Sequence, residues 1–473
     1  MAETVTIAPT SRLMGRGKVT IHLDEAGEVA ESRFHVVEFR GFEKLCEGRM
    51  FWEMPVITTR ICGICPVSHH LASAKACDDL LRAKIPSAAK KLRELMHMGQ
   101  FIQSHAFHFL FLAAPDFLLG PASNPAKRNI VGLMENDPEL IRRATRLRKI
   151  GQGIVERVGG RSTHPVAAMP GGMSKPLSHE DRFVMQKEID EALELALFAL
   201  EMGKNIYRQH SAFPSGFATI QTKHLGLVRD GNLELYDGRL RLKDLDGSTL
   251  EEFDPKDYLN YIGERVEDWS YMKFPFYKKE GYPQGIYRVA PLARLNVADD
   301  ISTPLASKEL ELFKSLGHGK PVQETLYYHY ARLIEMVYAV ERAKQLLDDD
   351  DIVSYEVRVR LDRTAGEGIG VIEAPRGTLI HHYWADEVGR IKKANLIVGT
   401  VHNNLAINMS INEVAKEYIK GDRLEEEALN MIEVAIRCYD PCLSCATHAL
   451  GQMPLTISLR GADGRELSRL QRP

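Results

Sequence analysis

Two Cys-x-x-Cys pairs, one near each end of the chain, constrain the fold more than any other feature of this sequence. Cys62 and Cys65 lie in RICGICPVSHH, Cys442 and Cys445 lie in DPCLSCATHAL, and Cys65 and Cys442 are 377 positions apart. Small zinc folds place their two pairs within about twenty residues of each other. If all four sulfurs bind one metal centre, the two ends must meet, and the intervening chain becomes one scaffold around that centre.

The residues around the pairs favour a buried metal site at helix ends. Thiolates are soft ligands suited to nickel, iron, zinc and copper(I), and a two-residue gap lets both sulfurs of a pair face one metal. Pro66 can open a helix after the first pair, and Pro441 ends the helix that precedes the second. Arg60, His69 and Asp440 are side chains of the kind that orient sulfur ligands.

Two other interpretations of the cysteines stay open from the residues alone. One is a structural four-cysteine zinc site that holds the ends of the chain together. The other is a dithiol redox pair, although such motifs normally stand singly in a βαβ context, which neither pair has. The remaining cysteines, Cys46, Cys77 and Cys438, are expected to be small buried hydrophobic residues.

Composition excludes several partner classes. The chain has 473 residues, 44% hydrophobic and 26% charged, so it can bury a large core. A net charge of −3, without a run of Lys or Arg, argues against nucleic acid and anionic membranes as partners. The N-terminus has no apolar signal region, and Pro115 and Asp116 interrupt the most apolar stretch. We therefore expect no membrane span and a cytoplasmic location.

Periodicity predicts a mainly α fold with smaller β parts (α+β): a bundle of long helices preceded by a β segment. Apolar and polar residues alternate over about 17–40 around Asp24-Glu25-Ala26-Gly27, which predicts two strands joined by a turn. Helices are expected over residues 67–82, 87–114, 137–158, 178–209, 324–347 and 424–438. Asp137-Pro138 should cap the third of these, and Pro115 should end the second.

Between residues 213 and 297 the pattern weakens into short strands and turns, which predicts a surface-lying β and loop insertion. No internal repeat and no flexible linker divides the chain. We expect a single domain over 1–448.

The motifs resemble those of nickel-iron hydrogenase large subunits. RICGICPVSHH matches the pattern R-x-C-G-x-C-x-x-x-H, and DPCLSCATH matches D-P-C-x-x-C-x-x-H. The stretches FHVVEFRGFEKLCEGR, HPVAAMPGG, DWSYMKFPF, YRVAPLARLNV, GVIEAPRGTL and THALGQMPL resemble the NAD-reducing, bidirectional branch of that family. The resemblance covers nearly the whole chain.

The resemblance implies a role for each cysteine. Cys62 and Cys442 correspond to terminal nickel thiolates, and Cys65 and Cys445 to thiolates that bridge nickel and an iron carrying CO and cyanide. A terminal thiolate such as Cys442 can take the proton when H2 is split heterolytically.

It also implies roles for residues around the metals. Arg376 corresponds to an arginine above the open metal position, although an ion-paired arginine is the plainer interpretation of that residue alone. His69 would bond near Cys65, and Thr400 would contact a cyanide. Glu43 and His448 correspond to ligands of a second metal, usually magnesium.

The same resemblance implies partners. The electrons would pass first to an iron-sulfur small subunit, then to a flavin and iron-sulfur diaphorase module that binds NAD(P). The chain itself has no dinucleotide fingerprint, because the glycines of Gly366-Glu367-Gly368-Ile369-Gly370 have the wrong spacing. Nickel-insertion proteins and a maturation endopeptidase would act on a precursor, and residues 449–473 correspond to the C-terminal extension that the endopeptidase removes.

Two positions depart from the family pattern. Met14 stands where a proton-relaying glutamate is usual, and Arg16 replaces a histidine. A thioether cannot carry a proton at neutral pH, so we expect slowed proton transfer. An H2 sensor built on the same site is therefore an alternative function. A non-catalytic scaffold related to the quinone-reducing complexes is disfavoured, because those relatives lack the four cysteines.

Overall fold

The computed structural model describes residues 4–8, 10–15, 17–36, 41–120, 123–209, 213, 216–267, 269–270, 272–361, 366–419, 425–443, 456–460 and 466–471. Its α-helices are α1 Phe42–Cys46, α2 Met54–Ile57, α3 Pro66–Leu81, α4 Ser87–Phe107, α5 Ala114–Leu118, α6 Ile130–Asn136, α7 Pro138–Gly159, α8 His179–Gln209, α9 Tyr258–Tyr261, α10 Pro291–Val297, α11 Pro304–Ser315, α12 Tyr327–Asp348, α13 Gly399–His402, α14 Asn404–Tyr418 and α15 Glu426–Cys438. Its strands are β1 Thr4–Ala8, β2 Gly17–Leu23, β3 Val29–Val36, β4 Ala168–Met169, β5 Gly172–Met173, β6 Lys223–Arg229, β7 Asn232–Leu233, β8 Arg239–Lys243, β9 Thr249–Phe253, β10 Ile262–Arg265, β11 Phe274–Tyr277, β12 Tyr287–Arg288, β13 Gly366–Ala374, β14 Gly377–Ala385, β15 Ile391–Ile397, β16 Thr456–Arg460 and β17 Glu466–Gln471.

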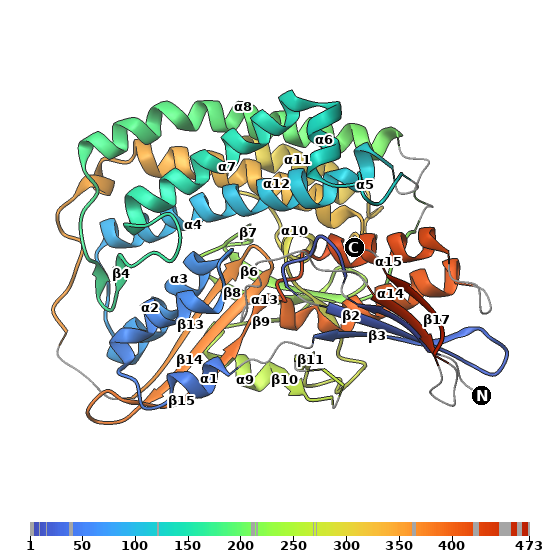
Figure 1. The fold of residues 1–473 in the computed structure, drawn as a ribbon. Helices are drawn as coiled ribbons and strands as arrows, with labels where there is room; N and C mark the ends of the chain where they lie inside the picture. The colour runs from blue at the N-terminus through green and yellow to red at the C-terminus, as the bar shows by residue number, and fades with distance from the viewer. Residues whose placement is uncertain are drawn as a thin grey trace.

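A layer of long helices lies on one side of the molecule, and the small sheets lie on the other (Figure 1). The helix α4 packs against α7 and α12, and α12 packs against α8. The cap at Asp137 is as predicted, since its side chain accepts a hydrogen bond from the Leu140 amide at 2.9 Å and α7 begins at Pro138. The predicted mainly α fold with smaller β parts is confirmed.

The prediction that Pro115 ends the second long helix is wrong. After α4 the chain continues through a π-helical segment, His108–Ala113, into α5, and Pro115 lies in the first turn of α5. A first-turn residue needs no intrahelical N–H bond, so the proline is tolerated there. The wider π turn therefore lets one continuous helical path include the proline.

The first and last described strands belong to one sheet, in the order β17-β16-β1-β2-β3. The predicted pair of strands forms its β2–β3 hairpin, with Thr20 opposite Arg33. On the other side, β1 pairs antiparallel with β16, and Thr6 lies opposite Ser458. Strands from the two ends of the sequence are thus neighbours.

The prediction that residues 213–297 form a surface-lying insertion is wrong for the parts that contain β6 and α10. The strand β6 is buried along nearly its whole length, and every residue of α10 is buried. Charged residues in this segment, such as Arg288 and Arg294, are 0% exposed and bind internal partners. These parts of the segment therefore belong to the core, whereas most residues of 244–267 and 278–284 are intermediate or exposed.

A three-stranded sheet, β13-β14-β15, packs against α3. A side chain at Gly368 would clash with the carbonyl of Ala76, and one at Gly370 with that of Ala72, so only glycine lets β13 lie this close to the helix. The glycine-rich stretch therefore serves strand-to-helix packing.

One large hydrophobic cluster extends from Ile7 to Leu443 and joins the sheets to the long helices. Along the part of the chain that the structure describes, no helix is long and apolar enough to cross a bilayer.

Candidate metal centre

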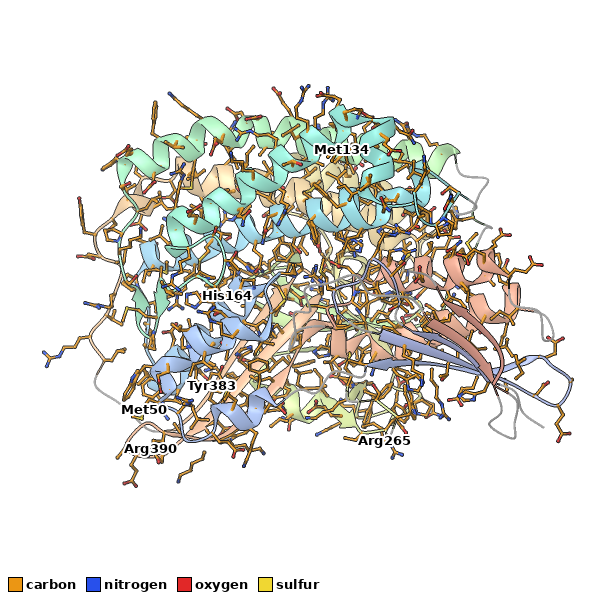
Figure 2. The ribbon with its side chains drawn as sticks, in the orientation of Figure 1. Met50, Met134, His164, Arg265, Tyr383 and Arg390 are labelled. Carbon is orange, nitrogen blue, oxygen red and sulfur yellow. The ribbon has the colours of Figure 1, made fainter. Side chains whose placement is uncertain are left out.

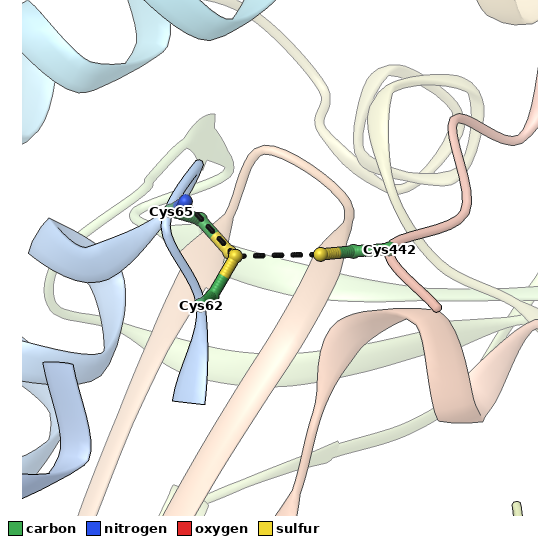
Figure 3. A group of neighbouring side chains, drawn as sticks. All are labelled: Cys62, Cys65 and Cys442. Carbon is green, nitrogen blue, oxygen red and sulfur yellow. Dashed lines mark hydrogen bonds between the residues drawn. The ribbon is translucent and has the colours of Figure 1, made fainter. Parts of the chain in front are cut away.

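Three of the four predicted cysteines meet in the interior. The Sγ atoms of Cys62 and Cys65 lie 3.0 Å apart, and those of Cys62 and Cys442 lie 3.3 Å apart. Figure 3 shows Cys442 reaching toward the Cys62–Cys65 loop from the opposite side. All three sulfurs lie within 4.8 Å of one another, and all three residues are buried. Cys445 lies outside the described residues.

Short-range geometry builds the first pair. A 3-10 turn, Thr58–Ile61, leads into Cys62, and Cys65 is the N-cap of α3, which Pro66 opens as predicted. The backbone amides of Ile64 and Cys65 both donate to the Cys62 sulfur, at 3.3 and 3.2 Å. Donors aimed at a sulfur favour its charged form, so this loop stabilises a thiolate at Cys62.

Two distant segments hold Cys442. The Thr400 hydroxyl accepts a hydrogen bond from the Cys442 amide at 3.0 Å, and the Met14 carbonyl accepts one from the Leu443 amide at 2.5 Å. Asp440, two residues before Cys442, has a positive φ of 52°, which turns the chain sharply into Pro441. Met14 therefore lies beside Cys442.

Arg376 occupies a buried turn that faces Asp440. Its Nη2 lies 3.1 Å from Asp440 Oδ1, and neither side chain is more than 3% exposed. Burial by itself lowers the pKa of Arg376, but Asp440, Cys442, Cys65 and Cys62 outweigh it, so the pKa is raised and the charge is permanent.

The guanidinium of Arg376 has unused hydrogen-bond donors. Within the described part of the chain, its three nitrogens are buried and make no hydrogen bond of good geometry. Buried N–H groups normally have a partner, so these donors point to an acceptor that the described residues do not supply.

His69 begins a buried chain of hydrogen bonds along α3. Its Nδ1 lies 3.1 Å from His381 Nε2, whose other nitrogen lies 2.7 Å from the Tyr383 hydroxyl. Tyr383, labelled in Figure 2, also bonds Ser73 at 2.9 Å. The ring of His69 is therefore fixed one helical turn from Cys65. Arg60, in contrast, is exposed.

Glu43 lies apart from the cysteines, on a separate cavity of about 260 Å³. Its Oε1 accepts a hydrogen bond from the Leu396 amide at 2.9 Å. Glu264 and Lys273 also line this cavity, and burial raises the pKa of Glu264 against the opposing charge of Lys273. The predicted partner of Glu43, His448, lies outside the described residues.

The residues present fit a soft transition metal. Three buried sulfurs converge within bonding range of one ion, and their separations are far longer than a disulfide bond of about 2.05 Å. The spare donors of Arg376 suit small electron-rich ligands on such a metal.

Sequence reasoning missed Arg294 and Glu264. Both stand in the stretch expected to be a surface insertion, where an arginine or a glutamate carries no special signal. The apolar residues around Arg294 in PLARLNV were the available sign of burial.

Comparison with known proteins gives consistent matches. A family model described as nickel-dependent hydrogenase matches residues 40–124 and 228–448, and one described as HoxL-like matches residues 4–39. The chain is 44% identical to the NAD-reducing hydrogenase HoxS subunit beta of Cupriavidus necator, over 98% of this chain and 99% of that protein. It is 43% identical to a subunit of the F420-non-reducing hydrogenase vhc of Methanococcus voltae, over 98% of each.

Comparison of the fold with solved structures also gives a hydrogenase as a match. A crystal structure of an NAD+-reducing [NiFe]-hydrogenase in the H2-reduced state aligns with a TM-score of 0.91 and 46% identity, over 94% of this chain and 99% of that one. With the cysteine cluster and the matched motifs, these likenesses show that the chain belongs to the nickel-dependent hydrogenase family.

Proposed function

We propose that this chain is the catalytic subunit of a hydrogenase that converts H2 reversibly into two protons and two electrons. The observation that carries the proposal is the convergence of Cys62, Cys65 and Cys442, buried and beside a permanently charged arginine. Cys445 completes the ligand set, and the iron of a nickel-iron pair carries CO and cyanide.

When bound, the nickel-iron centre supplies the Lewis acidity and the redox capacity that H2 cleavage needs. The chain contributes a proton acceptor, the Cys442 sulfur. Thr400 holds the backbone of Cys442. The same threonine hydroxyl keeps its own proton, which it can donate to a cyanide.

Arg376 fixes a positive charge over the site, and Asp440 balances that charge in a water-poor interior. Neither group needs to change its charge during turnover. The chain can therefore hold the site electrostatically constant while protons pass through Cys442.

Glu43 is proposed to bind a second cation, magnesium, together with His448. The support is a carboxylate on a cavity of about 260 Å³ that also contains Glu264. Magnesium prefers oxygen ligands and keeps several waters, which a cavity of this size can accommodate. Glu43→Gln should lower the magnesium content without lowering the nickel content, whereas loss of both metals would contradict separate sites.

The proposed partners follow from the similar proteins. One of these is named an NAD-reducing hydrogenase subunit, so we propose that electrons leave this chain for an iron-sulfur small subunit, from which they reach a diaphorase module that binds NAD(P). We propose a cytoplasmic location for the assembly.

Residues 449–473 are proposed to be an extension that a maturation endopeptidase removes after His448, once nickel-insertion proteins have acted. The strands β16 and β17 fall within this extension. Removal would therefore take two strands from the sheet and leave β1 at its edge.

Metal content and intact mass, measured on the same purified chain, test the proposal. Stoichiometric nickel and iron, with the mass of residues 1–448, would support a matured hydrogenase site. Zinc that persists after co-expression with a complete maturation system would favour the structural four-cysteine site instead. Correct metals with slow turnover and a regulatory partner would favour an H2 sensor.

A further inference from the structure

Arg294 lies beneath the turn that carries Arg376. It belongs to α10, and its side chain is 0% exposed. The turn connects β13 to β14: Ala374 pairs with Gly377, and Pro375 and Arg376 occupy its tip. Arg294 is therefore placed to act on the position of Arg376 through the backbone of the turn.

All five N–H donors of Arg294 have an acceptor. Nε and Nη2 donate to the two oxygens of Glu335 at 2.6 and 2.7 Å, and Nη1 donates to Glu373 at 2.9 Å. The other two donors reach backbone carbonyls of the turn, Ala374 at 2.9 Å and Pro375 at 3.3 Å. An arginine with every donor used has a single orientation available.

The two carbonyl contacts fix the peptides on either side of Pro375. Proline has no N–H, so the Ala374–Pro375 peptide can be held only through its carbonyl. The opposite side of the turn is closed as well, because a side chain at Gly377 would clash with Val289. The backbone of Arg376 is thus held between Arg294 and a packed wall.

We propose that Arg294 is the positioning residue that places the Arg376 guanidinium opposite Asp440. The inference rests on the proposed function, because it gives Arg294 its role through an arginine of the H2-converting site. A lysine at position 294 offers three donors from a point charge, so it cannot bind two carboxylates and two carbonyls at once. Arg294→Lys therefore frees the turn while it keeps the charge.

The chain provides a matched control in Arg93. It is also 0% exposed, it pairs with Asp78, and it donates to the carbonyls of Met169 and Gly172, at 2.8 and 2.9 Å, across the β4–β5 turn. Arg93→Lys therefore makes the same chemical change under a different turn.

The test measures amide hydrogen exchange by mass spectrometry on the full-length, metal-free chain. Arg294→Lys should speed exchange in residues 372–384 at least about tenfold, as expected when hydrogen bonds to a charged donor are lost, and should leave residues 168–173 unchanged. Arg93→Lys should speed exchange in residues 168–173 and leave residues 372–384 unchanged. If Arg294→Lys does not fold, Glu335→Gln, which weakens two of the bonds that anchor Arg294, should speed exchange in the same segment.

Metal-loaded protein supplies a second readout through a double-mutant cycle. Arg294→Lys should slow H2 turnover in the wild-type background and have no further effect in the Arg376→Lys background, while the effect of Arg93→Lys should be equal in both. Unchanged exchange in residues 372–384, or additive effects of the two substitutions on turnover, would overturn the proposal. Absence of turnover in the loaded wild type would contradict the proposed function instead, and the exchange data would still decide how Arg294 acts.

Discussion

The hydroxyl of Thr400 is predicted to be a main anchor of the Cys442 backbone. It accepts a hydrogen bond from the Cys442 amide at 3.0 Å, and the two residues are 2% and 5% exposed. Thr400→Val keeps a similar shape but removes the acceptor, so the buried amide loses this hydrogen bond. Such a loss costs about 1–3 kcal/mol.

Converted at about 1.4 kcal/mol per factor of ten, this cost corresponds to about 5- to 150-fold faster exchange of the Cys442 amide. The assay is hydrogen exchange at single-residue resolution on the metal-free chain. The neighbouring Leu443 amide, which Met14 holds, reports whether the whole segment opens or only Cys442 is released.

Thr400→Ser is the control, because it keeps the hydroxyl and should stay close to the wild-type rate. An exchange rate in Thr400→Val within twofold of the wild type would refute the reasoning. It would mean that the backbone geometry of the segment, rather than this hydrogen bond, holds the ligand.

Three further outcomes are expected. Arg376→Lys should lower H2 turnover about 100-fold at unchanged metal content, because a point charge replaces a fork of donors; metal analysis and H2 uptake check this. Burial lowers the pKa of His70 to about 4, and its ring accepts a hydrogen bond from the Ala168 amide. In the unfolded chain His70 has a pKa of about 6.5, so as the pH falls the unfolded state takes up a proton before the folded state does. The contribution of His70 to stability should therefore be full above about pH 6.5 and fall toward pH 4. His70→Gln should flatten this decline in denaturant unfolding. Met14→Glu should raise turnover by placing a proton carrier beside Cys442, and an unchanged H2 uptake rate would contradict the expected proton limitation.

Local signals in the sequence predicted α3, α4, α7, α8, α12 and α15 but did not predict α11 or α14. Asp137 and Pro138 cap α7 through contacts within one turn, so the sequence carries the whole signal. The strand β13 was missed because Gly368 and Gly370 have low strand propensity, whereas in the fold these glycines let the strand lie close to α3. Such tertiary contacts cannot be read from a local pattern.

Some residues of the candidate site could likewise be predicted from the sequence, and others could not. The cysteine pairs were visible because their spacing is a chemical signal in itself. Asp440 was proposed because it stands beside the second pair, whereas Arg376 and Thr400 came from the resemblance, since an isolated arginine or threonine is uninformative. The apolar neighbours of Arg294 in PLARLNV were a sign of burial, but its role could not be predicted, because a buried arginine and a surface arginine look alike until their partners are known.

The separation between the ligands also bears on how the chain is made. Cys62 and Cys442 are 380 positions apart, so at about 5–20 residues per second a ribosome needs roughly 20–75 seconds to synthesise the second after the first. Throughout that interval the nascent chain contains Cys62 and Cys65 but neither cysteine of the second pair. The strand β1 must likewise wait for β16, which emerges later still. The centre is therefore one of the last parts of the molecule able to form, at a stage when most of the helical scaffold is already available to receive it.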